Sequence, residues 1–327
     1  MKKFTTVLLV LLISVSFVFA QGGREVDASK FPTKTVETTV QWSAGGGADM
    51  AFRAFAEVFP KYANGRNMVI KNVPGASGVP GSAEFKENAS KDGYSLMHWS
   101  NAHVSNLHMN VVPYDNDSFR HVAQIVENTH YVLVRADSPW TSLDDFLADA
   151  KRRPQSISMG NGGSGGGNHL AALLLEEATG TSFVHVPFQG GAAALTGLLS
   201  GEVDAAMCNS PEGYANVEGN QLRMLVSFGA ERLAKFPSVP TAKESGLDIE
   251  LRQWRGFAVP VGTPEAIVER LDDIIRQVVS DPDFVARLDT IGAQAVYRNT
   301  EEYNAFVKSE DQRFMNLIKS KGFGNRY

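Results

Sequence analysis

The 327-residue chain has almost no cysteine and no excess of positive charge. Its single cysteine, Cys208, cannot form an internal disulfide, which excludes the small disulfide-stabilised scaffolds. There are 31 Lys and Arg against 36 Asp and Glu, giving a net charge of −5, and no basic run is longer than Lys151-Arg152-Arg153. Nucleic-acid surfaces draw their affinity from clustered Lys and Arg, so we predict no nucleic-acid partner. With 43% hydrophobic and 20% charged residues, the chain should fold, with a length typical of about two domains.

Long apolar runs are also missing, except at the start of the chain. Met1-Lys2-Lys3 and the apolar segment from Val7 to Ala20 are typical of a secretory signal peptide, which we place at residues 1–20. The segment is shorter than the roughly 20 residues that span a bilayer, and no nearby cysteine offers a point for lipid attachment. We therefore expect an exported, soluble, periplasmic protein that is not a lipoprotein.

Signatures of metal and nucleotide binding are absent or weak. No His-Glu-x-x-His or Cys-x-x-Cys motif occurs, and the five-residue spacing of His98, His103 and His108 does not place them on one helical face, so we predict no metal site. Gly160-x-Gly162-x-x-Gly165 matches the dinucleotide fingerprint, but the next strand ends in Pro187-Phe188-Gln189 instead of an acidic residue. Nucleotides are also scarce outside the cytoplasm. We therefore predict no cofactor.

The same glycine-rich segment contains Gly162-x-Ser164-x-Gly166, the pattern of a nucleophile elbow. A hydrolase of that fold needs an acid and then a histidine further along the chain. The only histidines after Ser164 are His169 and His185, and both come too early. We predict no enzymatic activity, with an exported serine hydrolase that uses Ser164 as the alternative from the enzyme class.

The strand and helix patterns occur in two series, which predicts two α/β lobes of similar size. We expect one lobe from residues 30–128 and 253–327 and the other from residues 129–252. Each lobe should be a mostly parallel sheet flanked by helices, with a hinge and a ligand cleft between the lobes, and the last third of the chain should be helical. Strands are predicted at residues 35–42, 68–73, 94–99, 131–135, 156–159, 183–187, 203–207 and 222–226, and the longer helices at 50–62, 142–151, 169–179, 192–200, 263–280 and 300–321.

Glycine is abundant, with 30 residues, and it clusters where a predicted strand leads into a predicted helix. The main clusters are at residues 43–49 in the first lobe and 160–169 in the second, with a third at Gln189-Gly190-Gly191. Glycine lets backbone N–H groups approach a ligand closely, and a helix N-terminus carries unpaired N–H donors and a partial positive charge. Loops of this kind facing one cleft would hold an anion such as a carboxylate.

Eight motifs follow one another along nearly the whole mature chain. They are Ser43-Ala-Gly-Gly-Gly-Ala-Asp49, Asn72-Val-Pro-Gly-Ala-Ser-Gly78, Asp92-Gly-Tyr94, Gly163-Ser-Gly-Gly-Gly-Asn-His-Leu170, His185-Val-Pro-Phe-Gln-Gly190, Ala194-Leu-Thr-Gly-Leu-Leu-Ser-Gly-Glu-Val-Asp204, Pro237-Ser-Val-Pro-Thr241 and Pro260-Val-Gly-Thr-Pro264. In this order they resemble the periplasmic substrate-binding proteins of tripartite tricarboxylate transporters, the Bug or TctC receptor family.

The resemblance implies a two-lobed, type II-like periplasmic-binding-protein fold that closes on a small carboxylate, such as a di- or tricarboxylate or a related organic acid. It also implies a monomeric receptor that delivers this ligand to the membrane permease subunits of a tripartite transporter. A subunit that presents its ligand to a signalling receptor is a further alternative, and the sequence does not separate the two roles.

The resemblance also implies which residues contact the ligand. They lie in the two glycine loops, at the end of the third strand and along the cleft side of the second lobe. Cys208 stands where the family commonly has an aspartate, and the first loop lacks the family's usual prolines, which makes Trp42 a departure. The implied ligand-binding residues are Trp42, Ser43, Ala44, Gly45, Gly46, Gly47, Asp49, Ser100, Asn101, His103, Gly163, Ser164, Gly165, Gly166, Asn168, His169, Gln189, Gly190, Cys208, Asn209 and Trp254.

Overall fold

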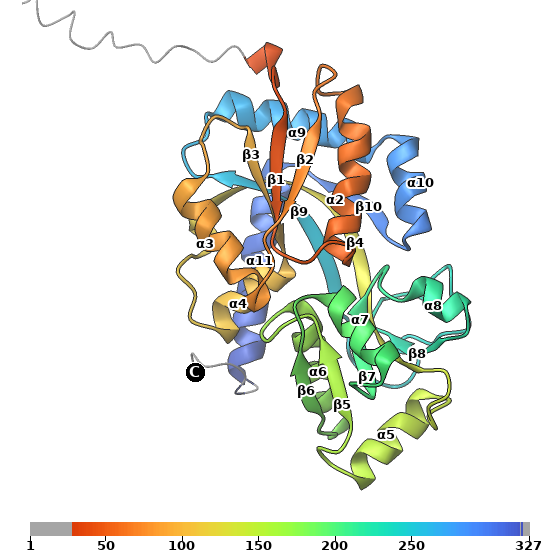
Figure 1. Ribbon diagram of the computed structural model, residues 1–327. Helices are drawn as coiled ribbons and strands as arrows, with labels where there is room; N and C mark the ends of the chain where they lie inside the picture. Colours follow the sequence, from red (N-terminus) through yellow and green to blue (C-terminus); the bar gives the residue numbers. More distant parts are fainter. Residues whose placement is uncertain (1–27, 321, 323–327) are drawn as a thin grey trace, which may run out of the picture.

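The computed structural model describes residues 28–320 and residue 322, and it shows two lobes, one above the other (Figure 1). The predicted signal peptide lies outside the described residues. The described strands are β1 (Val36–Val40), β2 (Met68–Asn72), β3 (Ser95–Ser100), β4 (Phe119–Arg135), β5 (Ser158–Asn161), β6 (Val184–Pro187), β7 (Ala205–Asn209), β8 (Leu222–Ser227), β9 (Arg252–Pro260) and β10 (Gln294–Arg298). The described α-helices are α2 (Gly47–Val58), α3 (Val79–Asn88), α4 (Asn101–Met109), α5 (Leu143–Arg152), α6 (Gly167–Thr179), α7 (Gly191–Ser200), α8 (Tyr214–Glu218), α9 (Glu265–Val279), α10 (Pro282–Thr290) and α11 (Thr300–Ser320). Short 3-10 helices are η1 (Ala28–Lys30), η2 (Phe59–Lys61), η3 (Ala76–Gly78) and η4 (Asn116–Ser118).

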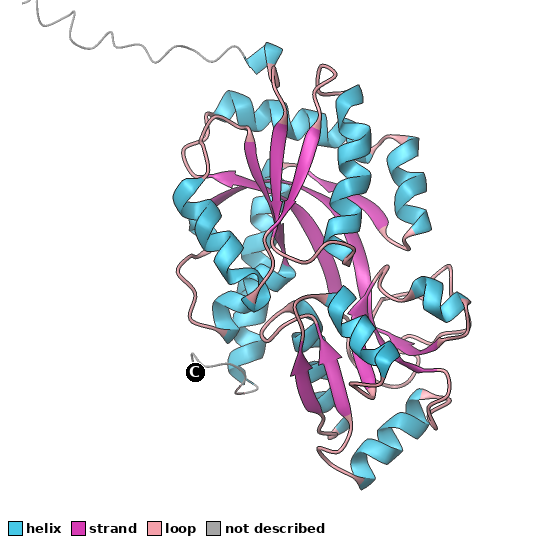
Figure 2. Cartoon of the chain, viewed as in Figure 1, coloured by secondary structure: helices cyan, strands magenta, loops and turns pink. Residues whose placement is uncertain are grey.

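Strand β4 belongs to the sheets of both lobes (Figure 2). In the upper lobe the strand order is β2-β1-β3-β9-β4, and β10 also pairs with β4. In the lower lobe β4 pairs with β7 and β8, and the sheet continues from β7 through β5 to β6. The change of partner falls between Thr129, which pairs with Arg252 of β9, and His130, which pairs with Asn209 of β7.

The two-lobed α/β fold is the one expected, but its sheets are mixed instead of mostly parallel. β1 pairs in parallel with β2 and β3, and β5 pairs in parallel with β6 and β7. The pairs that involve β4 or β9 are antiparallel because the chain enters the lower lobe along β4 and returns to the upper lobe along β9. The predicted division of the chain at 128/129 and 252/253 falls inside these two strands and stays a prediction.

The sequence patterns did not indicate several elements that depend on distant contacts. All residues of α4 are buried, so this helix lacks the polar stripe that marks an amphipathic helix. In the first half of β4, buried His121, Gln124 and Glu127 interrupt the alternation typical of a half-buried strand. The expectation of a wholly helical last third was wrong, because β9 and β10 add to the upper sheet there.

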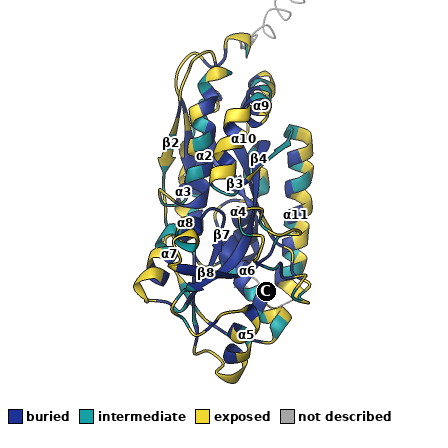
Figure 3. Cartoon of the chain, turned by 90° about the vertical axis from the view of Figure 1, so that its right-hand side faces the viewer, coloured by how far each residue is buried: buried dark blue, intermediate teal, exposed yellow. Residues whose placement is uncertain are grey.

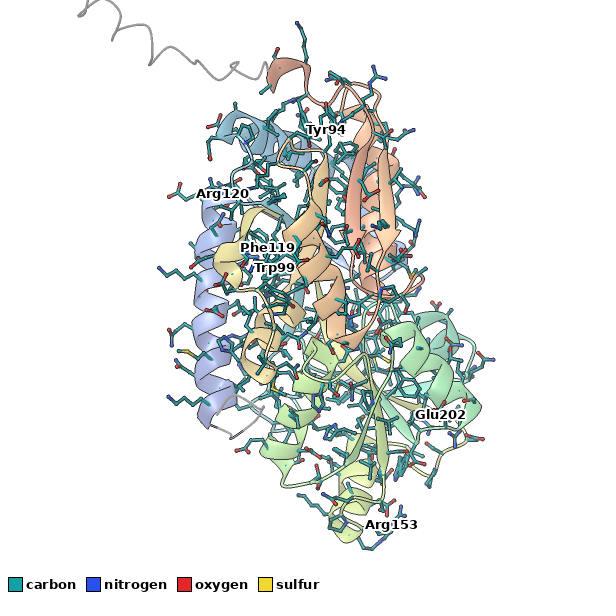
Figure 4. All side chains as sticks on the ribbon, turned by 60° about the vertical axis from the view of Figure 1, so that its left-hand side comes forward. Tyr94, Trp99, Phe119, Arg120, Arg153 and Glu202 are labelled. Carbon is teal, nitrogen blue, oxygen red and sulfur yellow. The ribbon has the colours of Figure 1, made fainter. Side chains whose placement is uncertain are left out.

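Buried residues lie where the helices face the sheets, whereas many residues on the outer faces of the helices are exposed (Figure 3). In the upper lobe Trp99 of β3 packs against Phe119 of β4, with ring centroids 5.1 Å apart (Figure 4). The Tyr303 hydroxyl of α11 donates a hydrogen bond to the Trp99 carbonyl oxygen, which joins the C-terminal helix to the upper sheet. These contacts fix the lower end of β3, where Ser100 begins the wall of a cavity.

None of the described helices combines the length and the apolar character needed to cross a membrane.

Candidate functional site

A cavity of about 470 Å³, including its mouth, lies where the two lobes meet. Its walls are formed by strand ends, by the first residues of helices and by a small number of polar side chains from both lobes. The cavity therefore lies where the two sheets predicted from the sequence were expected to face each other.

The N-terminal ends of four helices reach this cavity. In α2, α6 and α7 the residue before the first turn is Gly46, Gly166 or Gly190, which has no side chain of its own to cap the helix. The fourth helix, α4, begins after Ser100, whose side chain and backbone both interact with His103 in a capping box. Uncapped helix starts leave backbone N–H donors unpaired and carry a partial positive charge. The cavity wall is therefore suited to an anionic group.

Asp49 holds the first glycine loop from behind. Its carboxylate accepts hydrogen bonds from Gly45 N–H, from Arg53 Nε and from Asn72 Nδ2, each at 2.9 Å. Burial alone would raise the pKa of Asp49, but the hydrogen bonds from Arg53, Gly45 and Asn72 outweigh it, so the pKa lies below its usual value. Asp49 is therefore ionised at neutral pH and braces the loop without lining the cavity.

Residues of the upper lobe form hydrogen bonds with the second glycine loop. The Ser77 hydroxyl donates a hydrogen bond to the Ser164 carbonyl oxygen at 2.5 Å, and the Ser105 hydroxyl donates one to the Gly165 carbonyl oxygen at 2.9 Å. His169 accepts a hydrogen bond at Nδ1 from Gly165 N–H, 3.0 Å away. Ser164 is exposed, and within the described chain no hydrogen bond joins its hydroxyl to a histidine. This geometry lacks the activated serine that a hydrolase needs.

Two buried residues of opposite charge, Glu212 and Arg255, also line the cavity. The Glu212 carboxylate accepts hydrogen bonds from Gly47 N–H at 3.2 Å and from Asn209 N–H at 3.1 Å. Arg255 donates to the side-chain oxygens of Asn128 and Asn209, so Asn209 stands between the two charges. Burial raises the pKa of Glu212, and burial lowers the pKa of Arg255 to about 10. Arg255 is thus still a cation at neutral pH.

Some polar groups of the cavity wall have no partner within the protein. His98 is 1% exposed, and neither of its ring nitrogens makes a hydrogen bond. The Nε of Arg255 is also buried without a partner. Burial lowers the pKa of His98 well below its usual value, so the ring is neutral and offers one donor and one acceptor. Buried polar groups are normally satisfied, so these atoms indicate a place where a polar ligand or water binds.

The structure brings many of the predicted site residues to the cavity wall. They come from both glycine loops, from the end of β3 and from the end of β7. The predicted residues that line the cavity are Trp42, Ser43, Gly46, Gly47, Ser100, Gly166, Asn168, Gly190 and Asn209.

Other predicted residues lie just behind this wall and support it. Examples are Asn101, whose side chain donates to the Arg252 carbonyl oxygen, and His103, which stacks on Trp99 with ring centroids 4.6 Å apart. The exposed Gln189 contributes only its carbonyl oxygen, which accepts a hydrogen bond from Ser43. Besides Cys208 and Trp254, the predicted residues outside the lining are Ala44, Gly45, Asp49, Asn101, His103, Gly163, Ser164, Gly165, His169 and Gln189.

Two predictions, Cys208 and Trp254, are corrected because their side chains point away from the cavity. Cys208 is fully buried in the apolar cluster behind β7, beside Tyr131 and Leu133. Trp254 donates a hydrogen bond from Nε1 to Glu310 of α11 and packs against Tyr303. In a strand, neighbouring side chains point to opposite faces, so the cavity receives Asn209 instead of Cys208, and Gln253 and Arg255 instead of Trp254.

Several lining residues were missed by sequence reasoning. The glycines and alanines among them adjoin predicted positions, and the charged and polar ones had no motif of their own. A polar residue shortly after a predicted strand end, such as Glu212 after the strand at 203–207, was the available signal. The missed lining residues are Ala48, His98, Ala102, Gly162, Gly167, Gly191, Glu212, Gln253 and Arg255. In the part of the chain that the structure describes, no group of three or more His, Cys, Asp or Glu side chains could hold a metal ion.

Residues 52–323 match the family described as "Tripartite tricarboxylate transporter family receptor". A Cupriavidus necator protein, described as the UPF0065 protein in the gbd 5' region, is 30% identical over 305 residues, which cover 91% of this chain and 90% of its own. The structure of MatC from Rhodopseudomonas palustris with bound malate has a TM-score of 0.83 and 26% identity, covering 88% of this chain and 100% of its own. The structure of R. palustris Rpa4515 with adipate has a TM-score of 0.85 and 26% identity, covering 90% of this chain and 99% of its own.

Proposed function

Because the chain belongs to the tripartite tricarboxylate transporter family of receptors, we propose that it captures a small carboxylate outside the cytoplasm and delivers it to a tripartite transporter permease. The family resemblance of the eight sequence motifs is thereby confirmed. The family is one of periplasmic solute receptors, and the structures of MatC with malate and of Rpa4515 with adipate both pair a similar protein with a carboxylate. We propose that the ligand of this chain is also a carboxylate.

The observation that carries the proposal is the convergence of uncapped helix starts from both lobes on one cavity. In the upper lobe the start of α2 lines the cavity through Gly46 and Gly47. In the lower lobe the starts of α6 and α7 line it through Gly166 and Gly190. His98 and Arg255 add unpaired donors at the same wall. Apart from the N–H of Gly47, which Glu212 already binds, a carboxylate would satisfy the N–H groups at these helix starts and interact favourably with the positive ends of the helix dipoles.

Binding is expected to hold the two lobes together. A ligand that contacts α2 in one lobe and α6 or α7 in the other favours the arrangement in which both lobes meet it. The closed receptor would present a surface to the permease that the open receptor lacks. The cycle that we propose makes and breaks no bond of the ligand, so the protein acts as a receptor and not as an enzyme. We also propose that it acts as a monomer.

A thermal-shift screen of carboxylates, each paired with its amide, tests the proposal. A ligand that binds only the folded state raises the melting temperature, because it adds to the free energy of unfolding. At a ligand concentration one hundred times Kd this addition is about 2.7 kcal/mol. We expect at least one carboxylate of the panel to raise the melting temperature and its amide to leave it unchanged. Mass spectrometry of acid released from protein purified without refolding would name the natural ligand. If no carboxylate shifts the transition and no acid co-purifies, the proposal fails.

A further inference from the structure

Glu212 already occupies donors that an anionic ligand would otherwise use. Among the cavity-lining residues that the structure describes, it is the only acidic one. Its carboxylate accepts hydrogen bonds from Gly47 N–H, in the first turn of α2, and from Asn209 N–H at the end of β7. On the other side lies Gly191, at the start of α7, where an added Cβ would overlap the carboxylate. The negative charge of Glu212 therefore lies between two helix starts, one from each lobe.

The charged side chains of the cavity balance each other. Arg255 supplies one positive charge and Glu212 one negative charge, and His98 is neutral because burial disfavours its charged form. A ligand with two or three carboxylates would add its negative charges beside Glu212 in a buried site. Buried charges are costly unless they have partners of opposite sign. A dicarboxylate that has no positively charged group is therefore poorly matched to this cavity.

Other donors are still available for a single carboxylate. The helix α6 starts at Gly167 without a side-chain cap, and Gly166, Gly167 and Asn168 line the cavity. The ring of His98 and the Nε of Arg255 are buried and have no partner in the protein. These groups lie on the same cavity as Glu212, whose carboxylate can accept further hydrogen bonds beyond those from Gly47 and Asn209.

We propose, building on the receptor function above, that Glu212 restricts this receptor to carboxylates that also carry a positively charged nitrogen, as amino acids do. The ligand's ammonium group binds the Glu212 carboxylate. Its carboxylate binds the start of α6, with His98 and Arg255 as further donors. The bound ligand then pairs with both charges of the cavity wall, because its ammonium group faces Glu212 and its carboxylate faces Arg255.

Matched ligands that differ only in the amino group test this proposal by titration calorimetry on the unaltered protein. The pairs are aspartate with succinate and γ-aminobutyrate with butyrate. We expect the amino compound of at least one pair to bind about tenfold or more tightly than its partner, the ratio that a hydrogen bond to a charged group supplies. Equal or tighter binding of the compounds without the amino group would overturn the proposal.

The variant Glu212→Gln keeps the shape of the side chain and removes its charge. It should lower the affinity for the amino compound, raise the affinity for succinate, and so reduce the preference by about tenfold. Glu218→Gln is the matched control, because Glu218 is exposed, belongs to the same lobe and pairs with Lys235 outside the cavity. An unchanged preference in folded Glu212→Gln would overturn the role of Glu212.

The two proposals fail in different ways. If succinate and aspartate bind equally, the selectivity assigned to Glu212 is wrong and the carboxylate receptor stands. If no ligand of either class binds, the receptor function itself is wrong, and the inference falls with it. The measurements on the unaltered protein decide this even if Glu212→Gln does not fold.

Discussion

The Ser77 hydroxyl donates a hydrogen bond to the Ser164 carbonyl oxygen, 2.5 Å away, and so joins two segments that are 87 residues apart in the chain. Ser77 belongs to the upper lobe and Ser164 to the glycine loop of the lower lobe. A second bond of the same kind runs from the Ser43 hydroxyl to the Gln189 carbonyl oxygen, also at 2.5 Å. Both acceptors are backbone atoms, so these contacts between the lobes depend on the two serine hydroxyls and on no acceptor side chain.

The double variant Ser43→Ala, Ser77→Ala should shift the receptor toward separated lobes. Each neutral hydrogen bond contributes about 0.5–1.5 kcal/mol, so we expect the ligand affinity to fall roughly tenfold, because part of the binding energy must then close the lobes. Calorimetry measures the affinity, and small-angle scattering measures the larger radius of gyration. Ser309→Ala is the control, since that hydroxyl bonds only within α11, to Phe306. Unchanged affinity and radius in the double variant would contradict this prediction.

Asp49→Asn should weaken both the fold and the binding of ligand. The Asp49 carboxylate accepts hydrogen bonds from Gly45, Arg53 and Asn72, and an asparagine side chain cannot accept all of them. We expect the free energy of unfolding in urea to fall by about 1–3 kcal/mol and the affinity to fall because the loop at 43–47 loosens. Asp248→Asn, at an exposed position, is the control and should match the unaltered protein in both measurements.

The protein should lose stability as the pH falls from 7 to 5. Burial lowers the pKa of His103 to about 3 and the pKa values of His121 and His130 to about 4, from 6.5. The unfolded chain therefore binds more protons than the folded one between pH 6.5 and about 4, so acid favours unfolding. Each pH unit in this window costs about 1.4 kcal/mol for each such histidine.

Melting temperatures measured at half-unit steps of pH would show this loss. Glu212 acts in the opposite direction, because its raised folded pKa favours proton uptake on folding, but it is one group against several histidines. Return to pH 7 should restore the original transition. A melting temperature that stays level or rises between pH 7 and pH 5 would refute the assignment of buried, neutral histidines.

Ser164→Ala should leave the protein without esterase activity, as the unaltered protein is expected to be. Ser77 donates its hydrogen bond to the Ser164 carbonyl oxygen and not to the Ser164 hydroxyl. The Nδ1 atom of His169 already accepts a hydrogen bond from Gly165 N–H. We expect the ligand affinity of the variant to stay within about twofold, because the backbone contact survives the substitution. Assays with short-chain nitrophenyl esters suffice, and turnover that disappears in Ser164→Ala would instead support a serine hydrolase.

The parts of the site that were predictable from the sequence are those built locally. A strand, a glycine-rich loop and a helix start follow one another within a dozen residues, so the local pattern alone places the segments around Gly46 and Gly166 at a cleft. Arg255 could not be placed in this way, because its position depends on β9 pairing with both β3 and β4, which are distant in the chain. Cys208 and Trp254 show a second limit. The sequence can place the end of a strand at the cavity, but an error of one residue assigns the cavity to the side chains of the opposite face.

The sharing of β4 by both sheets makes the lobes thermodynamically dependent on each other. Every stretch of this strand pairs with neighbours, first β9 and β10 and then β7 and β8, and the partners change between adjacent residues. If one lobe unfolded alone, β4 would lose its order along with that lobe, and the remaining sheet would lose a central strand. We therefore expect a single cooperative transition in calorimetry, with equal van't Hoff and calorimetric enthalpies, from a molecule that has two separate lobes.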